Sequence, residues 1–107
     1  LDEDELLRDW WFNPKNPEFT WLEVVVVDND GNHIRWEVSD YGGDDGSSMA
    51  RTTGLVTVGC VEAWLRDPRM LPPGVHAPES LAPSVVRGII DMMKENGVEI
   101  TGPEVGL

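Results

Sequence analysis

Hydroxyl and guanidinium groups gather where a glycine-rich acidic loop runs into an expected helix. The loop and the helix start read Gly42-Gly-Asp-Asp-Gly-Ser-Ser-Met-Ala-Arg-Thr-Thr-Gly54. Ser47 or Ser48 can cap the first helical turn, and the free backbone N–H groups of that turn point outward. Arg51, one turn further along, adds a fixed positive charge. The stretch therefore predicts an anion-binding site.

The same charges allow a second interpretation, in which Arg51 is used within the chain. Asp40, Asp44 and Asp45 lie close to it in the sequence, and a pair with one of them would fix the loop. The pattern favours neither interpretation over the other. A metal ion among these carboxylates has no support from histidine or cysteine.

A β-hairpin is expected to deliver the chain to this loop. Residues 21–28 are a β-branched run, residues 33–40 alternate, and an Asp-Gly pair at 30 and 31 favours a tight turn. We interpret the polar turn as a hairpin turn and not as a calcium loop, because the glycine and glutamate of the calcium pattern are missing. With a two-residue turn, Val25 faces Trp36 and this side forms the core.

The opposite side of the hairpin then carries Leu22, Val24 and Val26. Three aliphatic side chains on one face of a two-stranded ribbon need a cover. That cover is either another part of a larger domain or a second copy of the chain. We therefore predict an interface at these residues.

Two helices and a short strand complete an expected α+β fold. Residues 48–66 carry few charges and apolar residues around most of the circumference, which predicts a helix central in the packing. A connector rich in proline leads to a helix over 83–96, which has one apolar stripe and ends near Gly97. Residues 98–100 are expected to add a short last strand, and residues 101–107 a loose tail.

The chain is expected to be a single domain, 1–107, of which residues 1–17 are an N-terminal extension. Early acidic residues and helical spacing of apolar residues predict a short amphipathic helix, which the Asn-Pro-Lys-Asn-Pro stretch ends. Trp10 and Trp11 need a cover: either they fold back on the core, or they contact absent sequence or another subunit.

Composition excludes several function classes. Twenty acidic residues against eight basic ones give a net charge of −12, which repels phosphate backbones and anionic lipid surfaces. No apolar run reaches the roughly 20 residues that span a bilayer. We expect no nucleic-acid partner, no membrane partner and a cytoplasmic location. The single Cys60 cannot form an internal disulfide, in keeping with a reducing compartment.

The run from Asp45 to Gly54 resembles the helix start in the C-terminal part of the saccharopine dehydrogenase family of NAD(P)-dependent oxidoreductases. Further similarity lies in the strand at 24–28, in Pro73-Gly-Val-His-Ala-Pro-Glu79, and in the helix ending Glu95-Asn-Gly97. The resemblance covers residues 22–100. The chain differs from the family after the Thr-Gly pair: family members usually have an alanine-rich helix there, and this chain does not. Nothing in the chain could be the family's nucleotide-binding half.

The resemblance implies a C-terminal fragment of a larger enzyme of amino-acid metabolism, which forms or cleaves a secondary amine. In that setting the segment helps build the substrate domain and is not catalytic alone. Candidates for holding a substrate carboxylate are Ser48, Arg51, Thr52 and Thr53. The complete enzyme would use NAD or NADP, and this segment would bind neither.

The partner that the resemblance implies is the rest of the same enzyme, with its nucleotide-binding domain. The uncovered aliphatic side chains of the hairpin predict a second partner, another copy of the chain in a homodimer. An alternative of a different class is a noncatalytic protein-interaction or homo-oligomerisation module. It depends on Leu22, Val24 and Val26 and on the tryptophan pair.

Overall fold

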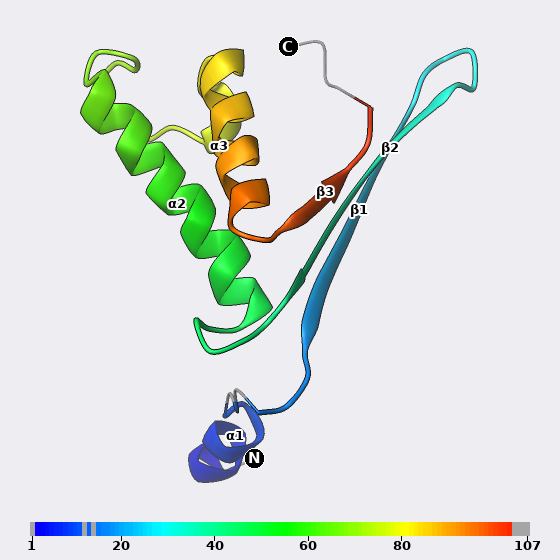
Figure 1. Cartoon of the computed structure of the whole chain (residues 1–107), viewed down its shortest axis with the longest axis vertical. Helices are drawn as coiled ribbons and strands as arrows, with labels where there is room; N and C mark the ends of the chain where they lie inside the picture. The colour runs from blue at the N-terminus through cyan, green and yellow to red at the C-terminus, as the bar shows by residue number, and fades with distance from the viewer. Residues whose placement is uncertain (1, 12, 14, 104–107) are drawn as a thin grey trace.

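The computed structural model describes residues 2–11, 13 and 15–103 and has the expected α+β fold (Figure 1). A three-stranded antiparallel sheet has the order β1-β2-β3, and the long hairpin diverges from two packed helices. The elements in chain order are α1 (Glu3–Asp9), β1 (Phe19–Val27), β2 (His33–Tyr41), α2 (Ser48–Arg66), the 3-10 turn η1 (Pro78–Ser80), α3 (Pro83–Glu95) and β3 (Glu99–Thr101).

The hairpin turn is longer than the sequence predicted, and this shifts the register by one residue. Gly31 has a φ of 83°, and its N–H donates to the carbonyl oxygen of Asp28 at 3.1 Å. The N–H of Asp28 in turn donates to the carbonyl oxygen of Asn32 at 3.0 Å. Three residues, 29–31, therefore form the loop, as in turns that close with a left-handed glycine. The predicted two-residue turn was wrong.

The corrected register reverses the predicted faces of β1. Leu22 pairs with Val38, Val24 with Trp36, and Val26 with Ile34. Val38 of β2 packs against the core, so its face of the sheet is the one that the helices cover. Every second residue of β1, counted from Leu22, lies on that same face. Leu22, Val24 and Val26 thus lie on the face that was expected to be the core, and not on its opposite. They are still exposed, because the hairpin extends past the helices.

The core lies between α2, α3 and the base of the hairpin. Its buried apolar residues are Leu81, Ile89, Met93 and Val98. Gly59 of α2 allows close helix packing, since a Cβ there would lie 2.9 Å from Ile89 Cγ1. The predicted central position of α2 was wrong: one side packs on the core, but Val61, Trp64 and Leu65 are at least half exposed.

The C-terminal elements follow the prediction closely. Pro83 begins α3, and Gly97 has a φ of 91° directly after its C-cap. The chain then pairs β3 with β2, placing Ile100 opposite Val38. Thr101, expected in the loose tail, is the last residue of β3, and residues 104–107 lie outside the described residues.

The N-terminal helix lies apart from the core. Asp2 caps α1 by accepting from the N–H of Asp4 at 3.3 Å, and α1 has no buried residue. Trp10 and Trp11 are 77% and 79% exposed. In the structure the two tryptophans therefore do not fold back on the core, contrary to one of the two interpretations.

Candidate functional site

The start of α2 binds a carboxylate, and that carboxylate belongs to the chain itself. Ser47 is the N-cap, with its hydroxyl accepting from the N–H of Ala50 at 3.1 Å. The backbone N–H of Ser48 donates to Glu18 Oε1 at 2.7 Å, and the Ser48 hydroxyl donates to Glu18 Oε2 at 2.7 Å. Both oxygens of one side chain thus satisfy groups of the first turn, where negative charge is favoured.

Burial and a glycine make this contact specific. Ser48 is fully buried, and its hydroxyl oxygen also lies 2.5 Å from Thr20 Oγ1. Gly42 leaves room for the carboxylate: a Cβ at that position would lie 1.7 Å from Glu18 Oε1. The start of α2 is therefore joined to β1 through Glu18 and Thr20.

Arg51 joins three further parts of the chain. Its Nε donates to Asp40 Oδ2 at 2.9 Å, and its Nη2 donates to the carbonyl oxygen of Asn96 at 2.6 Å. A third contact reaches the carboxylate of Asp45 in the loop. The Arg51 side chain is 14% exposed and that of Asp40 is 2% exposed. The hydrogen bond to Asp40 raises the pKa of Arg51, so its charge is fixed at any physiological pH.

The four predicted carboxylate-binding residues lie in the first two turns of α2, where the spacing places Ser48, Arg51 and Thr52 on one side of the helix and Thr53 on another. Ser48 is buried, and Arg51 contacts acidic residues of the chain, as the second interpretation of Arg51 requires. The Thr52 hydroxyl donates to the carbonyl oxygen of Ser48 at 2.9 Å. Thr53 is exposed. A substrate carboxylate at Ser48 or Arg51 would have to replace Glu18, Asp40 or Asp45.

Sequence reasoning missed Glu18, which is the central ligand of the site. It lies 30 positions before Ser48, and no local pattern marks it. The hairpin register brings it there: Phe19 pairs with Tyr41, and one step further the N–H of Gly42 donates to the Glu18 carbonyl oxygen. Only the strand pairing predicts this contact.

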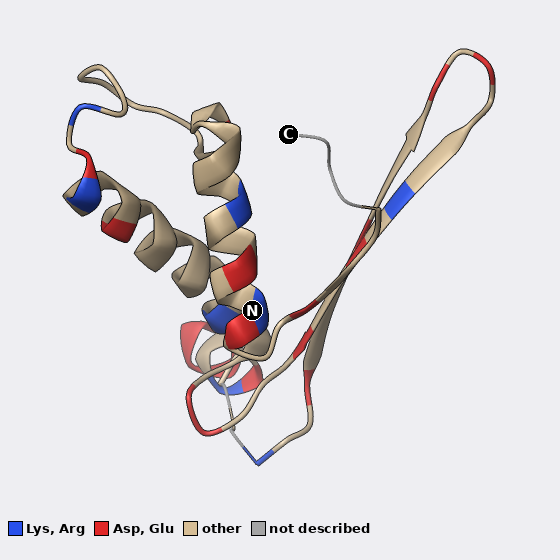
Figure 2. Ribbon diagram, turned by 45° about the horizontal axis from the view of Figure 1, so that its top comes forward, with Lys and Arg blue, Asp and Glu red and all other residues tan. Residues whose placement is uncertain are grey.

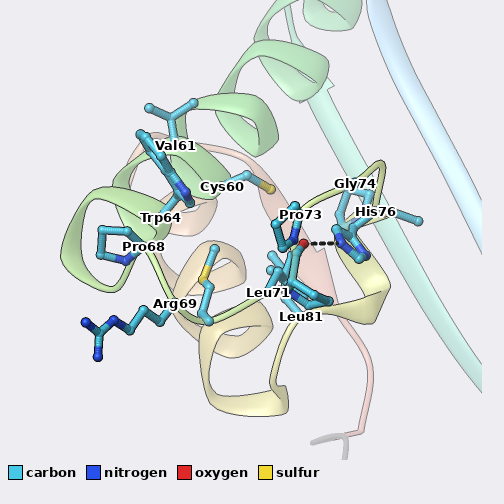
Figure 3. A pocket seen from close by; sticks show the side chains of 14 residues that line it. Cys60, Val61, Trp64, Pro68, Arg69, Leu71, Pro73, Gly74, His76 and Leu81 are labelled. Atoms are coloured by element: carbon cyan, nitrogen blue, oxygen red, sulfur yellow. Dashed lines mark hydrogen bonds between the residues drawn. The ribbon is translucent and has the colours of Figure 1, made fainter.

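A second concave region lies beside the C-terminal half of α2 (Figure 3). It has a volume of about 930 Å³ and is lined mainly by apolar residues of α2 and of the proline-rich connector, among them Cys60, Trp64, Leu71 and Leu81. The His76 ring nitrogen Nε2 lies 2.7 Å from the Pro72 carbonyl oxygen, so this histidine stabilises the connector. The region offers apolar contact and no set of converging polar groups.

Acidic residues gather in two other parts of the structure. Figure 2 shows acidic residues on the loop before α2 and at the tip of the hairpin. Within the described residues, no group of histidine, cysteine or acidic side chains has the arrangement of a metal site. No helix in the described part of the chain has the length and apolar character needed to cross a bilayer.

Comparison with known proteins adds no relative. No family model, curated protein or solved structure matches the chain. The resemblance to saccharopine dehydrogenases therefore stays a prediction from the sequence.

Proposed function

We propose that the chain is a noncatalytic C-terminal segment of a saccharopine-dehydrogenase-like oxidoreductase that acts on a secondary amine or amino acid. The observation that carries the proposal is the helix start within the resembling run: α2 begins at Ser48, directly after the glycine-rich loop. The segment contributes a hairpin and a helix pair to the substrate domain. The enzyme's remaining residues would cover the apolar side chains that α2 exposes.

In this proposal the α2 start has a structural role. Glu18, Asp40 and Asp45 satisfy Ser48 and Arg51 and hold α2 at a fixed angle to the hairpin base. A rigid start of this kind can position neighbouring residues of a larger site. Thr53 is the exposed member of the predicted set, whereas Arg51 and Thr52 are partly buried.

NAD or NADP would bind the nucleotide-binding half of the complete enzyme and supply the hydride chemistry there. The segment alone carries no G-x-G-x-x-G sequence after a strand. We expect calorimetric titration of the chain with either nucleotide to give no heat of binding, and a micromolar site would contradict the assignment. A cytoplasmic location goes with the proposal, because a single cysteine cannot form an internal disulfide.

The experiment that tests the proposal identifies the natural polypeptide. Antibodies raised against the chain are used to probe an extract of its source cells, and the protein they capture is assayed for NAD(P)H oxidation with an amino acid and an oxo acid. We expect a polypeptide much longer than 107 residues with this activity. A captured protein of about this length, or a longer one without reductive amination, would overturn the assignment.

The large solvent-exposed area of the chain favours a second candidate function, that of an interaction or homo-oligomerisation module. The chain exposes 8519 Å², whereas a folded monomer of its mass exposes about 6,000 Å². The residues that contribute include Leu22, Val24 and Val26 of β1 and the pair Trp10 and Trp11. This function is compatible with membership of a larger enzyme.

A further inference from the structure

The outer edge of β1 is long and unprotected. β1 is the first strand in the order β1-β2-β3, and no described element pairs with its far side (Figure 1). Its nine residues, FTWLEVVVV, contain no proline or lysine and a single charge, at Glu23. In native proteins the edge strand of a sheet is usually short, or it carries a bulge or charged side chains, because its unpaired backbone groups can recruit another strand.

The hydrogen bonds of the hairpin show which backbone groups form this edge. The N–H of Asp28 donates across the hairpin to Asn32, and the carbonyl oxygen of Glu18 accepts from Gly42. In an antiparallel pair such bonds alternate along the strand, so even-numbered residues of β1 bond to β2. The odd-numbered residues from Phe19 to Val27 therefore direct their N–H and C=O groups outward.

We propose that this edge pairs antiparallel with the β1 edge of a second copy of the chain, about a two-fold axis perpendicular to the sheet. Two copies of the same edge can bond to each other when they run antiparallel, because each offers both N–H and C=O groups. The two-fold axis uses up both edges, so the assembly contains two copies and no more. The other edge of the sheet is less suitable, because β3 already pairs with β2 at residues 37–39 and leaves only the separate stretches 33–36 and 40–41 open.

The side chains on the helix-covered face of the sheet are compatible with this two-fold axis. A two-fold axis perpendicular to the sheet keeps the same face of each copy on the same side. On the face that carries Leu22, Val24 and Val26, these residues pair with Val38, Trp36 and Ile34, and none of the six is charged. Two such faces join without bringing acidic side chains together. On the opposite face the pairing brings the two copies' Glu23 side chains near each other, and each of them has its own Arg35 at 2.6 Å as a counter-charge.

The dimer also covers surface that the single chain leaves bare. Antiparallel pairing places the base of one hairpin, where α2 contacts β1 through Ser48 and Thr20, beside the tip of the other. The helices of each copy then lie on the same side of the joined sheet as the other copy's Val24 and Val26. The single chain exposes about 2,500 Å² more than a compact monomer of its mass, and the exposed apolar residues of β1 contribute to this excess.

Sedimentation equilibrium and amide hydrogen exchange on the whole chain test the proposal together. We expect a dimer whose amides at Trp21, Glu23 and Val25 exchange about tenfold more slowly in concentrated than in dilute solution. The amides of Leu22 and Val24, bonded within the hairpin, should change less. This alternation is the signature of edge pairing and requires no variant.

A matched pair of proline variants separates the edge from the hairpin. Val25→Pro removes an outward N–H and should give a monomer with an intact hairpin. Asn29→Pro lies in the turn, at a position where proline suits the backbone, and should remain dimeric. A wild-type monomer at about 1 mM would overturn the proposal. So would a dimer with fast exchange at the odd positions, dimeric Val25→Pro, or assemblies that grow beyond two copies.

Discussion

Arg51 is the residue through which the hairpin base, the acidic loop and the end of α3 are joined. Its guanidinium contacts Asp40, Asp45 and the carbonyl oxygen of Asn96. Asp40 is buried, so removal of the guanidinium leaves a carboxylate without its partner away from water. We expect Arg51→Ala to lower the free energy of unfolding by about 3 kcal/mol, measured by urea denaturation.

Arg35 provides the control for this substitution. It also has two acidic partners, Glu23 at 2.6 Å and Glu37, but its side chain is 56% exposed. Arg35→Ala should cost less than about 1 kcal/mol. Equal losses for the two arginine variants would contradict the structural role of Arg51.

Glu18 and Gly42 form a pair that a double-mutant cycle can test. Glu18→Ala removes the carboxylate from the start of α2 and should cost about 1–2 kcal/mol, the usual value of a lost helix cap. Gly42→Ala places a Cβ where Glu18 Oε1 lies, so it should displace the same carboxylate. In the Glu18→Ala background Gly42→Ala should therefore cost much less than alone. Additive losses in thermal unfolding would show that Glu18 does not occupy the site.

At the scale of elements, helix positions could be predicted from sequence because their signals are local. The serine N-cap, the proline at the start of α3 and Gly97 after its end all act within a few residues. The strand register could not, because the number of residues in the hairpin loop depends on hydrogen bonds to Asp28. One residue of error exchanged the faces of β1 and concealed Glu18, whose contact with Ser48 follows from the pairing.

The hairpin turn has a pH dependence that follows from Asp28. The side chain of Asn32 donates to Asp28 Oδ2 at 2.8 Å, and this bond, with the backbone N–H of Asn32, lowers the pKa of Asp28. The folded carboxyl thus has a lower pKa than the unfolded one, whose value is about 3.9. Its stabilisation of the turn is fully present above the unfolded value and is lost as pH falls through the folded value.

NMR titration of the Asp28 carboxyl carbon should measure this shift directly. Asn32→Ala removes the first cause of the shift, so the pKa of Asp28 should move up toward its ordinary value. Titration of Asp28 at the same pH in both proteins would contradict the contact between the two side chains.

The whole molecule is more extended than its length requires. Its radius of gyration is 17.2 Å, whereas a compact domain of 107 residues has about 13 Å. Four buried apolar residues form the centre of the core, while β1 and one side of α2 remain exposed. The proposed dimer would add its own contribution to the stability that this small core provides.

Stability should therefore depend on protein concentration. If unfolding separates a dimer, a hundredfold increase in concentration adds about 2.7 kcal/mol to the free energy of dimer unfolding. The urea midpoint of the chain should rise across that range, because the folded dimer is favoured by mass action. Val25→Pro, which interrupts the free edge of β1, should have one midpoint at every concentration, and Asn29→Pro should behave as the unmodified chain does. A constant midpoint for the unmodified chain would mean that the small core and the exposed hairpin are stable without a second copy.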